Sequence, residues 1–247
     1  MKIKQYLDST YLKTNAQSGL CEAENLEVVK AVIAEAIVEN FKLVMVRPDR
    51  VAVARQMLDD NKSHVLVGTV IDFPDGTGTI EDKLTEAAAA ILNGADDLDF
   101  VVNYTAFKEG NTKVVEQLVV EGTQLGLKNG NAVKWIIEIA ALTNEQIVQL
   151  CKLIKNTVTS NFDESAWRSV FVKSSTGFFI TENGLPNGAT VPVIKLMLAA
   201  SQPLPVKAAG GVRNYDEAVQ MIELGVKRIG TSSAQAIAKG QSASEGY

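Results

Sequence analysis

The chain has 247 residues, of which 46% are hydrophobic and 21% charged, and its formal net charge is −5 at pH 7. This composition is typical of a folded globular protein, and the acidic balance offers no basic surface for nucleic acid. The apolar runs are shorter than the roughly 18 residues of a membrane span, so no membrane partner is expected. The N-terminal stretch also lacks the long apolar run of a signal peptide.

Cysteine and histidine usage narrows the chemistry. Cys21 and Cys151 lie far apart and in no metal-binding spacing, so we interpret them as free thiols of a reducing cytoplasm, the location predicted here. His64 is the single histidine, so one chain cannot build a two-histidine metal site. It precedes a strand-like run without an obvious nucleophile nearby, and we interpret it as structural or superficial. We therefore expect no metal and no other cofactor, and chemistry that depends on Lys, Asp, Glu or Tyr.

In chain order, strand-like apolar runs alternate with segments of helical periodicity. The first half predicts strands over residues 2–10, 42–48, 64–74 and 97–104, each followed by a helix, over residues 26–40, 48–60, 80–92 and 112–127. The second half predicts strands over residues 132–140, 170–179, 205–212 and 226–233, with helices beginning near residues 143, 192, 214 and 234. Thr143 and Gln146 form a capping-box pattern, and Asn214 with Glu217 gives a similar start signal.

Eight strand–helix units in about 250 residues predict an α/β fold, a (β/α)₈ TIM barrel. Length alone allows one or two domains, and we assign residues 1–247 to a single domain. Its C-terminal tail, residues 240–247, is small and polar, and we expect it to be flexible. A doubly wound sheet is the alternative, but its Gly-rich fingerprint is absent after the first strand. The glycines at residues 76 and 78 lack the third glycine of that motif, because Glu81 takes its place, so we interpret this stretch as a loop.

In a TIM barrel the active site lies at the C-terminal ends of the strands. Polar residues interrupt or end the predicted strands at Asp8, Thr10, Asp99, Glu138, Lys173, Ser174, Ser175, Thr176 and Lys207. Strand alternation points Lys173, Lys207 and Asp99 into the barrel while their apolar neighbours face the helices. A single lysine at a strand end is more often a surface residue with a buried stem. Two lysines at matching places on adjacent strands, with an aspartate across the barrel, favour a site instead.

The two lysines suggest an activated amine. An unperturbed lysine has a pKa of about 10.4, so only about one in ~2,500 is uncharged at pH 7. Two ammonium groups in a desolvated pocket disfavour each other's charge, and a neighbouring cation is a known way to activate a Schiff-base lysine. Lys173 and Lys207 therefore read as a nucleophile and its electrostatic activator.

A second cluster follows the last two strands. Glycines and hydroxyls occur in residues 209–213 after the seventh strand and in residues 230–233 after the eighth. Barrels often bind phosphate with these two loops, because glycines let backbone N–H groups approach the ligand. Two glycines alone could merely turn the chain, but both loops together favour a phosphate site.

Four motifs carry a family resemblance. LDST (residues 7–10), LDFVVNY (98–104), VKSSTGF (172–178) and VKAAGGVR (206–213) resemble the deoxyribose-phosphate aldolase family, with fitting order and spacing along nearly the whole chain. The resemblance implies a metal-free class I aldolase. Its reversible reaction would cleave 2-deoxy-D-ribose 5-phosphate to D-glyceraldehyde 3-phosphate and acetaldehyde. The sequence gives no oligomeric state, and a homodimer stays open.

The resemblance also implies roles for single residues. Lys173 corresponds to the Schiff-base lysine, Lys207 to the second lysine that perturbs it, and Asp99 to a carboxylate that moves protons through water. Tyr247 corresponds to a tail tyrosine that assists proton transfer. The expected substrate-binding residues are Asp8 and Thr10 near the second lysine, Thr176 after the sixth strand, and a phosphate cradle of Gly177, Gly210, Gly211, Gly230, Ser232 and Ser233.

Several other functions remain as alternatives. A different phosphosugar Schiff-base aldolase would use the same lysine. A metal-dependent aldolase is disfavoured by the single histidine. A phosphosugar isomerase on this fold would need a carboxylate base such as Glu138 and would leave Lys173 unexplained. A barrel that only binds phosphosugars would need no reactive amine at all.

Overall fold

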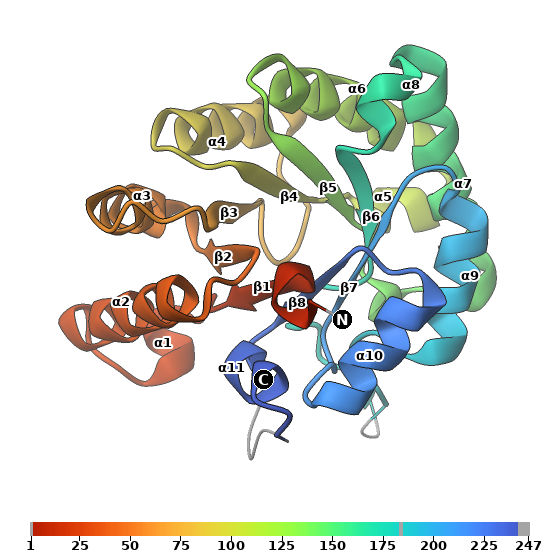
Figure 1. Ribbon diagram of the computed structural model, residues 1–247. Coiled ribbons are helices and arrows are strands. Elements are labelled where there is room, and N and C mark those ends of the chain that lie inside the picture. The colour runs from red at the N-terminus through yellow and green to blue at the C-terminus, as the bar shows by residue number, and fades with distance from the viewer. Residues whose placement is uncertain (1, 183–184, 242–247) are drawn as a thin grey trace.

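The computed structural model describes residues 2–182 and 185–241, and it confirms the predicted (β/α)₈ barrel. Eight parallel strands pair in chain order, and the last closes the barrel against the first. The strands occupy the centre of Figure 1, with the first (red) beside the eighth (blue). They are β1 (Leu7–Thr10), β2 (Leu43–Val46), β3 (Leu66–Ile71), β4 (Asp97–Val101), β5 (Ala132–Ile136), β6 (Val170–Lys173), β7 (Val206–Ala209) and β8 (Arg228–Thr231).

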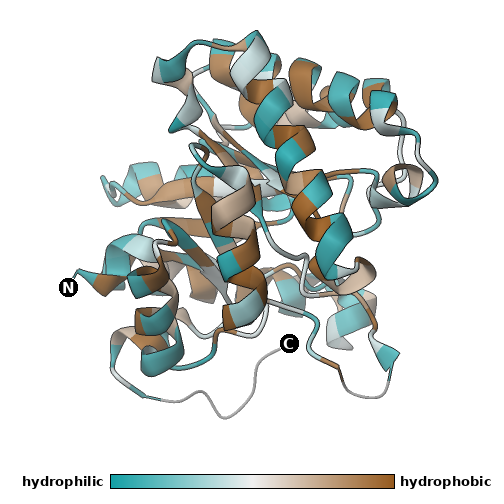
Figure 2. Cartoon of the chain, turned by 90° about the vertical axis from the view of Figure 1, so that its right-hand side faces the viewer, coloured by the Kyte–Doolittle hydropathy of each residue, from teal (hydrophilic) through white to brown (hydrophobic). Residues whose placement is uncertain are grey.

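Helices surround the strands (Figure 1), as the sequence periodicity predicts. In Figure 2 they carry both hydrophobic and hydrophilic bands, because one face packs on the barrel and the other meets solvent. The long helices are α2 (Glu22–Glu39), α3 (Val51–Asp60), α4 (Ile80–Leu92), α6 (Thr112–Lys128), α7 (Asn144–Asn161), α9 (Val191–Ser201) and α10 (Tyr215–Leu224). The short ones are α1 (Asn15–Ser18), α5 (Tyr104–Lys108), α8 (Glu164–Trp167) and α11 (Ala234–Ala238), with 3₁₀ turns η1 (Ile3–Tyr6), η2 (Pro48–Arg50) and η3 (Ile139–Ala141).

The predicted helix starts at residues 143 and 214 are confirmed. The Thr143 hydroxyl accepts from the Gln146 N–H, and the Asn214 side chain accepts from the Glu217 N–H. The glycines at residues 76 and 78 lie in a loop between β3 and α4, as predicted.

Several strands are shorter than predicted. The first was expected over residues 2–10, but β1 begins at Leu7 and residues 3–6 form η1. A barrel strand extends only as far as its neighbours pair with it, and β8 and β2 pair only with residues 7–10. The fifth strand was expected to include Glu138. It ends at Ile136, and Glu138 adopts the left-handed conformation with φ of 51°.

The strands separate two cores. A large apolar core fills the space between the outer strand faces and the helices. Inside the barrel, strand register places Lys173 opposite Lys207, and Asp99 opposite Lys134. The interior near β2 and β3 instead holds a small apolar cluster of Leu12, Leu43, Met45 and Val70, with Leu66, Phe73 and Phe178 packed against it. Over residues 2–182 and 185–241, the structure contains no helix with the length and hydropathy that a membrane crossing requires.

Candidate active site

A cleft opens at the C-terminal ends of the strands, with about 460 Å³ of space that includes open solvent. The amine-bearing Lys173 reaches this cleft from β6. The other lining residues come mainly from the ends of β1, β6, β7 and β8. They are Thr10, Leu12, Thr176, Gly177, Ala209, Gly210, Gly211, Val212, Arg213, Gly230, Thr231 and Ser232.

Below the cleft, one carboxylate oxygen holds both predicted lysines. The Nζ atoms of Lys173 and Lys207 each lie 2.8 Å from Oδ2 of Asp99. Lys207 and Asp99 are fully buried, whereas Lys173 keeps 4% of its surface exposed, toward the cleft. The inward alternation predicted from the sequence therefore brings these three side chains together.

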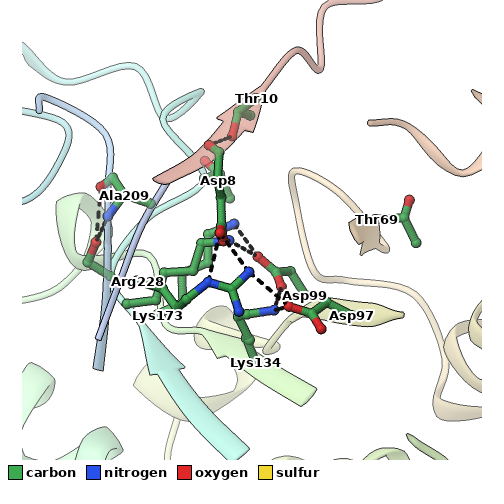
Figure 3. A network of polar contacts seen from close by, with 12 residues as sticks. Asp8, Thr10, Thr69, Asp97, Asp99, Lys134, Lys173, Ala209 and Arg228 are labelled. Carbon is green, nitrogen blue, oxygen red and sulfur yellow. Dashed lines mark hydrogen bonds and ion pairs between the residues drawn. The ribbon is translucent and has the colours of Figure 1, made fainter. Parts of the chain in front are cut away.

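Four more charged side chains continue this arrangement (Figure 3). The other Asp99 oxygen lies 2.9 Å from Nζ of Lys134, which is also 2.7 Å from Asp97. Lys207 pairs with Asp8 at 2.6 Å, and the Arg228 guanidinium contacts both Asp8 and Asp97. We call the seven residues the ion cluster: Asp8, Asp97, Asp99, Lys134, Lys173, Lys207 and Arg228.

The ion cluster joins four basic side chains to three acidic ones. A surplus cation in a desolvated site is unfavourable, and the group that can shed its proton most easily relieves it. Burial is the largest cause that lowers the pKa of Lys173, to about 8, and Lys207 and Lys134 lower it further against the attraction of Asp99. At pH 7 about a tenth of Lys173 is then uncharged, compared with about one in ~2,500 for a free lysine.

The neighbours of Lys173 keep their charges. Burial alone would raise the pKa of Asp99, but Lys134, Lys173 and Lys207 outweigh burial and hold it well below the usual value. Burial alone would lower the pKa of Lys207, but the carboxylates of Asp8 and Asp99 raise it instead. One amine of the pair is thus poised to lose its proton, while the other stays a cation.

At two positions near the cleft, Gly188 and Gly230, a side chain would collide with neighbouring atoms. Gly210 has φ of 77° and touches Gly188 so closely that a Cβ on Gly188 would lie 2.3 Å from the Gly210 carbonyl carbon. The loop after β6 can therefore rest directly on the turn after β7. A Cβ on Gly230 would lie 3.2 Å from Cε of Lys207, so this glycine leaves room for the buried lysine stem.

The predicted site residues divide into four groups. Thr10, Lys173, Thr176, Gly177, Gly210, Gly211, Gly230 and Ser232 line the cleft. Asp8, Asp99 and Lys207 lie beneath it in the ion cluster, and Thr10 donates from its hydroxyl to the Asp8 carbonyl at 2.8 Å. Ser233 is buried and is not among the lining residues, and its N–H donates to the Thr231 hydroxyl at 3.0 Å. Tyr247 lies outside the described residues.

Sequence reasoning missed Lys134, Asp97 and Arg228. Each reads as a polar residue at the beginning or middle of a strand, where a surface position is the ordinary interpretation. The available signal was the spacing of Asp97 and Asp99, which places both on the same face of one strand. The lining residue Arg213 was part of a quoted motif but had no assigned role.

The remaining sequence predictions concern metals, thiols and histidine. Residues 2–182 and 185–241 contain no group of three or more His, Cys, Asp or Glu side chains that could hold a metal ion. Both cysteines are free thiols, Cys151 buried and Cys21 exposed. His64 is exposed and does not line the cleft.

Comparisons with known proteins agree with the motifs. No protein-family model matches the chain. The deoxyribose-phosphate aldolase of Streptococcus gordonii is 39% identical over 251 aligned residues, covering 100% of both chains. The one from Thermococcus gammatolerans is 38% identical over 241 residues, covering 97% of this chain and 96% of that one.

The fold gives the same result. The solved deoxyribose phosphate aldolase of Aeropyrum pernix, described as a tetramer, superposes with a TM-score of 0.77 at 25% identity, covering 96% of this chain and 89% of that chain. Since the curated relatives match along nearly their full length, the chain belongs to the deoxyribose-phosphate aldolase family.

Proposed function

We propose that this protein is a class I aldolase that reversibly cleaves 2-deoxy-D-ribose 5-phosphate to D-glyceraldehyde 3-phosphate and acetaldehyde. The observation that carries the proposal is Lys173. Its amine reaches the cleft with its pKa lowered to about 8, and it shares one Asp99 oxygen with Lys207. An amine poised in this way suits covalent catalysis on a carbonyl compound.

In the synthetic direction, neutral Lys173 adds to the carbonyl carbon of acetaldehyde and gives a carbinolamine. Loss of water leaves an iminium, which acts as an electron sink. A proton then leaves the methyl carbon, and the resulting enamine adds to the aldehyde carbon of glyceraldehyde 3-phosphate. Hydrolysis of the new iminium releases the product and returns the amine. Asp99 accepts a hydrogen bond from Lys173 and is therefore placed to carry protons in these steps.

The phosphate would bind away from the chemistry. Gly177, Gly210 and Gly211 line the cleft, together with Ser232 and the cationic Arg213. Backbone N–H groups, a hydroxyl and a guanidinium are suitable phosphate partners. Such contacts would hold the sugar so that its reacting carbon meets Lys173, which contributes orientation rather than bond making. Tyr247 keeps its proposed role in proton transfer.

The isomerase alternative is weakened by the place of its base. Glu138 is buried and is not among the residues that line the cleft, because Thr176 stands between them. A carboxylate that abstracts a substrate proton must come within hydrogen-bond reach of that proton. Lys173 would also have no task in an isomerase.

The proposed partners are small molecules, and no metal or other cofactor takes part in the proposed reaction. The free thiols support the cytoplasm as the proposed compartment. A homodimer is one candidate for the assembly, and the A. pernix relative is described as a tetramer. Light scattering on the purified protein would distinguish the two states.

Reductive trapping tests the function. Borohydride reduction in the presence of acetaldehyde should leave an ethyl group on Lys173, identified by peptide mass mapping. The control is the same reaction without borohydride, which should leave no stable adduct. Turnover without any adduct, and dependent on an added metal, would overturn the proposal.

A further inference from the structure

Glu138 is a buried carboxylate in an unusual backbone conformation. Only 1% of its surface is exposed, and its φ of 51° lies in the left-handed region that a residue with a side chain rarely adopts. Strained conformations of this kind persist where the surrounding structure enforces them, and they gather at functional sites. The ion cluster does not include Glu138, and the proposed reaction gives it no step.

The conformation aims the carboxylate at the loop that follows β6. Oε2 of Glu138 accepts from the backbone N–H of Thr176 at 3.0 Å and also from the Thr176 hydroxyl. Because that hydroxyl donates to Glu138, its lone pair is free to accept from the Phe178 N–H at 3.0 Å. The Gly177 carbonyl accepts from the Asn187 side chain at 3.3 Å. Glu138 thus anchors a turn, residues 176–178, in which hydrogen bonds fix the orientation of the backbone groups.

This turn lies between Lys173 and the glycines that follow β7. Thr176 and Gly177 line the cleft three and four residues after Lys173, and Gly177 lies close to Gly210 of the next loop. Beyond the turn, the Phe178 ring packs edge-on against Phe73, with 5.1 Å between the ring centroids. A shift of Thr176 would therefore move the Gly177 backbone relative to the glycines of the phosphate side and leave the ion cluster in place.

We propose that Glu138 is a positioning residue that holds the turn of residues 176–178 and thereby sets the affinity for the phosphorylated substrate. The inference rests on the proposed function. The side chain holds the turn because it is long enough to reach Thr176 and can accept hydrogen bonds there. Its negative charge is not needed. An amide oxygen at the same place would serve, whereas a carboxylate withdrawn by one methylene would not.

Two variants separate reach from charge. Glu138→Gln keeps the acceptor oxygen and loses the charge, and Glu138→Asp keeps the charge and loses the reach. For Glu138→Asp we expect KM for deoxyribose 5-phosphate to rise about tenfold, with kcat within about threefold of the parent. KM for unphosphorylated 2-deoxyribose should change by less than about twofold, because that substrate does not use the phosphate contacts. Glu138→Gln should stay within about twofold for both substrates.

A matched control is available at the other side of the barrel. Glu86 likewise accepts from a backbone N–H, that of Asp72 at 2.7 Å, and Asp72 also has a positive φ of 52°. Neither residue lines the cleft. Glu86→Asp should therefore leave the ratio of the two KM values unchanged. Should Glu138→Asp fail to fold, Glu138→Asn repeats the test, since its amide oxygen is withdrawn by the same methylene.

The outcomes are distinct. An unchanged KM ratio in folded Glu138→Asp, or in Glu138→Asn where the aspartate variant does not fold, would overturn the positioning role. A large loss of kcat in Glu138→Gln, with KM unchanged, would also overturn it and identify the charge as the functional property. Acetaldehyde trapping on Lys173 is measured in every variant. A parent protein that traps nothing refutes the proposed function itself, whereas trapping with an unchanged KM ratio refutes only the role of Glu138.

Discussion

The interior of the barrel has two unlike sides. One side, supplied by β1 and β4–β8, holds the ion cluster, in which each charged side chain contacts at least one of opposite sign. The other side, near β2 and β3, holds the apolar cluster of Leu12, Leu43, Met45 and Val70. Parallel strands of four to six residues therefore support either lining, and the side-chain types decide where chemistry can occur.

The two sides have separate tasks. The apolar cluster offers no polar group that could solvate an ammonium, and electrostatic interactions strengthen where water is excluded. Burial accordingly is the largest cause of the lowered pKa of Lys173. The ion cluster then decides which amine loses its proton, because Asp8 and Asp99 hold Lys207 in its charged form. The following changes, from the largest expected effect to the smallest, test this division.

Replacing the nucleophile should have the largest effect. Lys173→Leu removes the amine that reaches the cleft, so aldol cleavage and acetaldehyde trapping should both fall below detection. The fold should survive, since the ion cluster then has equal numbers of acidic and basic groups. Circular dichroism and a thermal melt check that point. Residual turnover above about 1% of the parent rate would show that Lys173 is not the nucleophile.

Asp99→Asn should lower kcat by about 10²- to 10⁴-fold, the usual range for a lost proton carrier. The attraction of Asp99 raises the pKa of Lys173, so the variant should shift the pH–rate midpoint downward. A slower enzyme with a larger share of uncharged amine would separate proton transfer from amine activation. An upward shift of the midpoint would contradict the assigned electrostatics.

The parent pH profile should follow the Lys173 amine. Below a pKa of about 8 the amine is mostly protonated and cannot attack, so kcat/KM for cleavage should fall about tenfold per pH unit as the pH drops. Above that pKa the rate should level off. The rate should rise with pH, because the attacking form of Lys173 is the uncharged amine. A profile that is flat between about pH 6 and pH 8 would exclude this amine as the controlling group.

Lys207→Met should lower kcat/KM at pH 7 by about tenfold and raise the pH midpoint, because one of the cations that lower the pKa of Lys173 is lost. Raising the pH should recover much of the lost rate. The matched comparison is Lys134→Met, which removes another cation of the ion cluster that does not contact Asp8. If high pH does not restore the activity of Lys207→Met, then Lys207 acts by positioning Asp99 and not by lowering the pKa of Lys173.

The apolar cluster should affect stability more than chemistry. Met45 is fully buried, and Met45→Ala should lower the free energy of unfolding by about 2–4 kcal/mol through the cavity it leaves. The pH midpoint should stay within about 0.3 units, since no charge is moved. Urea denaturation and the pH profile measure the two effects. A midpoint shift comparable to that of Lys207→Met would show that the two sides are not separable.

The sequence predicts the barrel well, because each strand and helix has its own periodicity and start signal. It also predicts that Lys173, Lys207 and Asp99 meet, since strand alternation fixes their direction. It could not predict the partners of Asp99. Lys134 lies opposite Asp99 only once β4 and β5 are in register, and Arg228 meets Asp8 only once the barrel closes.

Glu138 was misplaced for a related reason. An apolar run continues on both sides of it, so the pattern favours a longer strand. Its left-handed conformation occurs together with hydrogen bonds to Thr176 in the loop after the neighbouring strand, which no local pattern encodes. Ser233 stays a prediction: it is buried beside the expected loop, and its N–H donates to the Thr231 hydroxyl.

The surplus cation of the ion cluster has a consequence for proton release. Four basic groups face three acidic ones, so below a pH of about 8 the resting site holds a positive nitrogen at Lys173. An iminium at that nitrogen carries the same charge. Conversion of the ammonium and acetaldehyde to iminium and water therefore exchanges no proton with the buffer, while above that pH the same step takes up one. Calorimetry of acetaldehyde binding in buffers of different ionisation enthalpy would register this change directly.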